Sequence, residues 1–232
     1  LGIAWSKQAT YLPDIRNGLD GWTSTLYIRN DGNWPRNAKV TFLNSDGSAS
    51  DTSFPALPAN AVWYTATLPS ANWAGAAIVD GNEDLSVMVA QERGSPYTID
   101  AYTGVFNPTS TVRIPIVQRK NSEIYSEIFI QNAGGTTTDV TTQFLPAPGY
   151  GNPVSHVWSG IVPGGWVKVR TIDLNDIGTG SYPNNVYVGS VLVTNSVNQP
   201  LAIASTQYKN GGATNHLYET SNTQPPAKTL KA

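Results

Sequence analysis

Apolar and polar residues alternate along much of the chain, in short runs that end at turn-forming residues. In the first half these runs cover residues 25–29, 38–43, 62–68, 76–79 and 85–92. They stop at combinations such as Asn30-Asp31-Gly32 and Asp46-Gly47, which favour tight turns. No long segment carries the 3.6-residue period of an amphipathic helix. The pattern therefore predicts antiparallel β-structure with one side of each strand buried.

The second half of the chain repeats the first. Pro13 and Pro115 lie 102 residues apart in similar apolar surroundings, and Leu26–Asn30 matches Ile128–Asn132 at the same separation. Later matches are up to 116 residues apart, because the second copy is longer at turn-like places. The order of the matches never changes, which is typical of tandem structural units.

We therefore expect an all-β protein built of two tandem antiparallel β-sandwich domains with an immunoglobulin-like outline. A barrel is the alternative architecture. The predicted domains cover residues 11–104 and 113–220, joined by a proline-containing linker at 105–112. An N-terminal tail of residues 1–10 and a C-terminal tail of residues 221–232 complete the chain.

Composition restricts the function mainly through what is scarce. The 232 residues carry a net charge of −2, with 13% charged side chains, two histidines and no cysteine. A near-neutral balance gives no electrostatic signal for binding nucleic acid. Without cysteine there are no disulfides and no thiolate chemistry, and no apolar run is long enough to span a bilayer. Together with a first residue other than Met, this predicts a mature bacterial protein that is extracellular or at the cell surface.

Few residues could support catalysis. The two histidines, His156 and His216, are not accompanied by a Gly-x-Ser-x-Gly nucleophile motif. Glu123 and Glu127 would point to the same side if residues 123–127 form a strand. That spacing suits a charged outer face as well as a glycosidase acid–base pair. We expect no catalytic residues and no enzymatic activity.

One segment resembles part of a calcium loop. Asp80-Gly81-Asn82-Glu83-Asp84 places side-chain oxygens at alternate positions. It lacks the following glycine and the distal glutamate that complete an EF-hand, and it lies where a hairpin should turn. A simple turn is the favoured interpretation, and we expect neither a metal nor a cofactor.

The aromatic residues and the chain ends suggest contact with a partner. Trp34 lies on a predicted turn and Trp5 lies outside the repeat, so neither has an obvious core to join. The tails resemble the internal linker in their placement, which would let chains join head to tail, with a tail adding a strand to a sheet edge. The predicted subunit-interface residues are Trp5, Tyr11, Trp34, Pro225, Pro226 and Leu230.

Several segments resemble tandem repeats of about 100 residues found in secreted surface proteins of filamentous bacteria. They are Gly21–Gly32, the strand and turn Val40–Gly47, and Gln199–Ser205. The resemblance covers residues 11–220 and implies a secreted β-repeat with no assigned chemistry. The second copy departs from it at Pro146–Gly149, which replaces the Asn-Ser-Asp-Gly turn. The two domains therefore need not play equal roles.

The predicted function is a non-enzymatic structural subunit that self-assembles into a surface filament, sheath or layer. Its partner would be further copies of the same chain, held together through tails and sheet edges. The alternative is a carbohydrate-binding or adhesive module that uses exposed Trp and Tyr to bind a surface glycan. A polysaccharide hydrolase is the third class considered.

Overall fold

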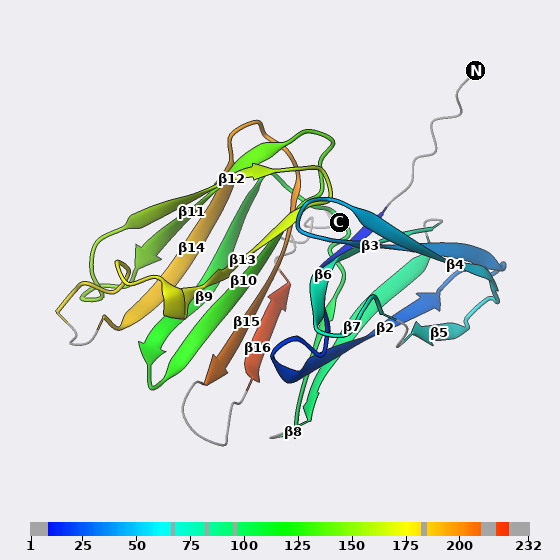
Figure 1. Ribbon diagram of the computed structural model, residues 1–232, viewed down its shortest axis with the longest axis horizontal. Helices are drawn as coiled ribbons and strands as arrows, with labels where there is room; N and C mark the ends of the chain where they lie inside the picture. The colour runs from blue at the N-terminus through cyan, green and yellow to red at the C-terminus, as the bar shows by residue number, and fades with distance from the viewer. Residues whose placement is uncertain are drawn as a thin grey trace, which may run out of the picture.

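Figure 1 shows the computed structural model of the chain, in which two antiparallel β-sheets lie side by side. The structure describes residues 9–65, 68–81, 84–94, 97–181, 185–209 and 217–222, apart from the side chains of 51–55, 97–98 and 217–222. Within this part of the chain the helices are two short 3-10 turns, Leu19–Gly21 and Thr171–Asp173. Neither is long or apolar enough to cross a membrane. The all-β prediction is confirmed.

The N-terminal sheet has the strand order β4-β3-β6-β1-β2-β7-β8, with β5 paired to β2. Its strands are β1 (Thr10–Asn17), β2 (Trp22–Asn30), β3 (Arg36–Leu43), β4 (Ala49–Leu57), β5 (Val62–Thr65), β6 (Trp73–Asp80), β7 (Leu85–Gly94) and β8 (Tyr97–Thr103).

The C-terminal sheet has the order β12-β11-β14-β9-β10-β15-β16, with β13 paired to β10. Its strands are β9 (Thr111–Asn121), β10 (Ile124–Asn132), β11 (Thr138–Pro146), β12 (Val154–Ile161), β13 (Trp166–Arg170), β14 (Tyr187–Asn195), β15 (Leu201–Lys209) and β16 (Leu217–Asn222). The order is that of the N-terminal sheet strand for strand, so the sequence repeat is also a repeat of topology.

Each sheet folds back on itself between its first two strands. Strands β1 and β2 share one ladder pair, Asn17 with Thr23, whereas β2 pairs with β7 along its whole length. Buried residues of β1, β3 and β6 pack with those of β2, β7 and β8 in a single apolar cluster. The two arms of the sheet therefore face each other across a core, and the C-terminal sheet has a core of the same kind. This explains the alternation in sequence, because the inward side of each arm is buried.

A proline lies at the same irregularity in both copies. Pro13 falls within the register shift between Leu12 and Ile15, where β1 pairs with β6. Pro115 falls within the corresponding shift between β9 and β14. Proline has no N–H to donate to a ladder, and a bulge is a place where a strand accepts it.

A buried asparagine ends β2 and its counterpart β10. The Asn30 side-chain amide donates to the carbonyl oxygens of Trp34 (2.8 Å) and Leu57 (2.9 Å), and its Oδ1 accepts from the Gly32 N–H at 2.9 Å. Asn132 makes the equivalent bonds in its own copy, and both residues are fully buried. Each asparagine satisfies backbone groups of two loops at once.

Replacing Asn30 with alanine should lower the free energy of unfolding by about 2 kcal/mol, because the buried backbone groups lose their partner. Urea denaturation followed by tryptophan fluorescence measures the loss. The matched control is Asn33→Ala in the same loop, where the side chain is exposed and the change should stay within about 0.5 kcal/mol. Equal losses in the two variants would contradict the role assigned to Asn30.

Candidate functional site

The structure describes two of the six residues predicted at a subunit interface. Trp34 lies on the turn after β2 and is 70% exposed, so it is free to contact a partner. Tyr11 lies half-buried on β1, and its hydroxyl donates to the carbonyl oxygen of Ala133 (3.2 Å), which belongs to the C-terminal half of the same chain. The other residues lie outside the described part of the chain, so their role stays a prediction; they are Trp5, Pro225, Pro226 and Leu230.

The residues considered for catalysis are not brought together. Strand β10 begins at Ile124, and Glu123 is an exposed turn residue with φ 65°. Residues 123–127 therefore do not form one strand, and the condition for a common face of Glu123 and Glu127 is not met, because a left-handed turn residue does not follow the alternation of a strand. His156, on the terminal strand β12, has its Nε2 3.2 Å from Oδ1 of Asp176. The other histidine, His216, lies outside the described residues.

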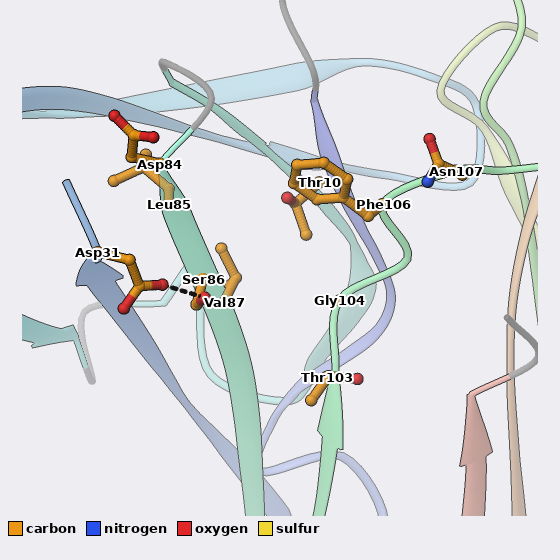
Figure 2. A pocket seen from close by; sticks show the side chains of 10 residues that line it. All are labelled: Thr10, Asp31, Asp84, Leu85, Ser86, Val87, Thr103, Gly104, Phe106 and Asn107. Carbon is orange, nitrogen blue, oxygen red and sulfur yellow. Dashed lines mark hydrogen bonds between the residues drawn. The ribbon is translucent and has the colours of Figure 1, made fainter. Parts of the chain in front are cut away.

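A groove of about 530 Å³ lies beside the start of β7 and the end of β8. Figure 2 shows Asp31 and Ser86 on one side of it, joined by a hydrogen bond from the Ser86 hydroxyl to the Asp31 carboxylate. The same carboxylate pairs with Arg29 at 2.9 Å. The Asp31 carboxylate is therefore already engaged by a cationic and a hydroxyl neighbour.

The turn that resembles a calcium loop is partly described. Residues 82 and 83 lie outside the described part of the chain. The carboxylate of Asp84 pairs with Nη2 of Arg36 at 2.5 Å, so this carboxylate already has a cationic partner within the chain. In the described ranges, no three His, Asp or Glu side chains gather closely enough to hold a metal ion.

The contact between the two sheets buries charged side chains from both. Arg16 on β1 and Glu127 on β10 lie 2.9 Å apart (Nη2 to Oε2), with side chains 3% and 7% exposed. Arg16 also donates from Nε to Oδ1 of Asp14 at 2.8 Å. Its guanidinium lies 4.7 Å from the ring centre of Phe129 on β10. One arginine thus contacts two carboxylates and an aromatic face, which is the geometry its planar group favours.

The Glu127 carboxylate also contacts basic side chains of its own sheet. Two residues of the neighbouring strand β13 approach its Oε1, Arg170 through Nε at 3.2 Å and Lys168 through Nζ at 3.9 Å. Lys168 also reaches Oδ2 of Asp20 in the N-terminal half, at 3.5 Å. Burial alone would lower the pKa of Arg16, but the carboxylates of Asp14 and Glu127 outweigh it and raise that pKa. The central arginine is therefore charged whenever the chain is folded.

The N-terminal core holds Asp14 and Arg16 in position. The Tyr102 hydroxyl on β8 donates to the carbonyl oxygen of Asp14 (2.5 Å) and accepts from its N–H (3.2 Å). Gln91 on β7 donates to the same carbonyl at 3.1 Å. Burial, reinforced by the charge of Asp14, raises the pKa of Tyr102 well above its usual value. The phenol therefore keeps its proton and remains a donor to the strand that carries the buried charges.

Close backbone approach extends the contact beyond the charges. The Trp166 indole N–H on β13 donates to the carbonyl oxygen of Leu43, at 3.2 Å. Gly47, in the turn after Leu43, has φ 77°, and a Cβ there would lie 2.8 Å from the side chain of Val162. Glycine allows this approach. On the other side of the contact, Ala204 of β15 joins the N-terminal apolar cluster.

These contacts define a geometry in which an edge of one copy covers a face of the next. Strands β1 and β8 belong to the N-terminal copy, and β10, β13, β15 and β16 to the C-terminal copy; Figure 1 shows β16, in red, beside the N-terminal sheet. On β10 every residue from Tyr125 to Asn132 is buried. One side of that strand faces its own core, and on the other side Arg16 of the N-terminal half lies against Glu127 and Phe129.

The sequence pattern does not reveal this network. Glu127 stands out in the sequence only as a catalytic candidate, and neither Asp14 nor Arg16 stands out as a functional residue. The available signal was a charged pair flanking Ile15 in an apolar strand, since charges in such a strand need partners when they are buried. No protein-family model matches the chain, and no curated protein matches it.

Replacing Arg16 with methionine should lower the free energy of unfolding by about 3 kcal/mol, because Asp14 and Glu127 stay buried with one cation fewer. Chemical denaturation measures the loss. Arg29→Met is the matched control, since Arg29 pairs with Asp31 at the surface, where the side chains are 57% and 40% exposed, and exposed pairs contribute under about 1 kcal/mol. If both variants lost a similar amount of unfolding free energy, the buried contact would contribute no more to stability than a surface ion pair.

Asp100 should make stability depend on pH. Its carboxylate accepts from Thr206 of the other half at 3.4 Å, and burial, with the nearby charge of Asp14, raises its pKa to about 6. In the unfolded chain an aspartate ionises near pH 4, so the folded state binds the extra proton between about pH 4 and pH 6. This contribution is complete below about pH 4 and is lost as pH rises through 6.

The Asp100→Asn variant should lack that loss. Unfolding free energies measured from pH 4 to pH 7 should fall less in the variant than in the original chain, with the difference developing between pH 4 and pH 6. Parallel profiles for the two proteins would contradict the raised pKa of Asp100.

Proposed function

We propose that this chain is a non-enzymatic structural subunit that self-assembles head to tail into an extracellular surface filament, sheath or layer. In this proposal each half is an immunoglobulin-like β-sandwich, and the two stand in tandem. The observation that carries the proposal is the buried contact in which Arg16, on the edge strand β1 of its arm, meets Glu127 on the outward side of β10.

Such a contact joins two different surfaces, one from each copy of the repeat. A contact between unlike surfaces is heterologous, and when the rotation does not close a ring it continues into a fibre. A chain with two similar copies already contains one step of that series. A second chain placed on the first by the same relation would add the next step, so the fold suits a polymer without any further element.

Composition supports the same proposal. Charged residues make up 13% of the chain and cysteine is absent, which suits a scaffold selected for packing and contact. The tails at 1–10 and 221–232 are proposed to strengthen the junction by pairing with sheet edges. Strand β16 ends at Asn222, so the first two residues of the C-terminal tail already belong to a strand.

A second candidate function is an adhesive module that binds a surface glycan. Exposed aromatic side chains favour it, because Trp and Tyr offer flat apolar faces with a polar edge. Trp34 is 70% exposed and Tyr64 is 67% exposed. Tyr64 lies beside Tyr27, with ring centres 6.2 Å apart and planes at 32°.

Assembly of the purified full chain tests the proposal. We expect negative-stain electron microscopy to show regular polymers, and sedimentation velocity to show a mass that grows with protein concentration. A chain that stays monomeric throughout the concentration series would contradict the structural role. Glycan-array binding that is lost in Trp34→Ala, in a chain that does not assemble, would instead establish the adhesive function.

A further inference from the structure

The same sheet face is buried in the C-terminal copy and exposed to solvent in the N-terminal copy. On β10 the outward residues Glu127 and Phe129 are 5% and 1% exposed. Their counterparts 102 positions earlier are Thr25 and Tyr27 on β2, which are only partly buried. Strand β2 alternates between buried and more exposed residues, whereas β10 is buried on both sides. The N-terminal copy therefore keeps uncovered the face that the C-terminal copy buries.

Apolar side chains enlarge this uncovered face. Tyr27 stands opposite Tyr64 on β5 and Met88 on β7, which are 67% and 40% exposed. Val62, also on β5, is 56% exposed, and Ile99 on β8 is 59% exposed. We call these five residues the free face. Exposed apolar side chains gathered on one face of a sheet often mark interaction sites in soluble proteins.

Strands β1 and β9, each the last strand of one arm of its sheet, show the opposite difference in burial. Pro13 and Asp14 on β1 are buried. Their counterparts on β9, Pro115 and Ile116, are exposed, Ile116 to 50%. Gln118, half-buried, stands where β1 has its buried arginine. We call Pro115, Ile116 and Gln118 the free edge, which is the uncovered counterpart of the surface that β1 applies to β10.

Four charged residues of the internal contact have neutral counterparts at the corresponding positions of β2, β5 and β9. Inside the chain, the arginine of β1 pairs with Asp14 on its own strand and with Glu127 on β10. The free edge carries Ile116 and Gln118 at those positions, and the position of Glu127 is taken by Thr25. The lysine of β13 is likewise replaced by Tyr64, since each stands opposite the matching residue of β10 or β2. A charge left on one side alone would be buried without a partner, so neutral residues at both sets of positions suit each other.

We propose that the free edge of one chain packs on the free face of a second copy, in the arrangement that β1 and β10 adopt within the chain. This inference rests on the proposed function and adds the two surfaces that make the polymer. Each added copy brings a new free face at one end and a new free edge at the other. The contact therefore propagates without closing.

A lysine on either surface should block assembly. Tyr64→Lys places a charge on the free face and Ile116→Lys places one on the free edge, both at positions already exposed to water. Each variant should raise the protein concentration needed for assembly at least about tenfold, as expected for a central interface residue. Val157→Lys on β12, where the side chain is 61% exposed and outside both surfaces, is the matched control and should assemble normally. Far-UV circular dichroism and thermal unfolding confirm that each variant folds.

Mixing the two blocked variants gives the sharper test. A Tyr64→Lys chain keeps its free edge and an Ile116→Lys chain keeps its free face, so an equimolar mixture should form dimers and stop there. Sedimentation velocity distinguishes these dimers from the monomers expected of each variant alone. A mixture that stays monomeric, or single variants that polymerise like the original chain, would overturn this pair of surfaces.

The original chain separates this inference from the proposed function. If it assembles while Tyr64→Lys and Ile116→Lys assemble equally well, the polymer stands and the surfaces assigned here are wrong. Deletion of residues 223–232 would then test the tails as the source of contact. If the original chain does not assemble, the proposed function and this inference both fail.

Discussion

The buried contact of Arg16 with Asp14 and Glu127 determines how the two halves of this protein are placed. Apolar surfaces attract without direction, and alone they would let one sheet slide over the other. A buried charge tolerates no such freedom, since moving it from its partner leaves both unsolvated and unpaired. The arginine comes from one sheet and Glu127 from the other, and Phe129 supplies a ring for the guanidinium. The contact therefore specifies one relative position.

That position gives the molecule its asymmetry. The copies share one strand order, yet one contributes an edge to the contact and the other a face. Identical topology with unequal roles is what a head-to-tail series requires, because the unused edge and face end up on different copies. In the proposed assembly, the exchange of charged for neutral residues would distinguish the internal contact from the contact between subunits.

Strands that the alternation predicted are those with one buried and one solvated side, such as β2 and β3. Strand β4 escaped notice, because Ala49–Leu57 is rich in small polar residues and contains Pro55. Strand β4 is the terminal strand of its sheet, and a terminal strand accepts proline and needs little apolar pattern. Strand β10 has the same spacing as β2, so its sequence predicted a strand but did not reveal that both its sides are covered.

The sequence by itself determined the all-β character and the repeat, because alternation and turn residues are local properties of the backbone. Only the tertiary structure decided what lies on the second side of each strand. In the sequence, Glu127 is a candidate catalytic acid, but in the fold it pairs with Arg16. Ile116 is an ordinary strand residue in the sequence, and its exposure gains meaning only because its counterpart Asp14 is buried. A partner more than 100 residues away in the sequence does not change the local alternation of apolar and polar residues, because burial depends on how the whole chain packs.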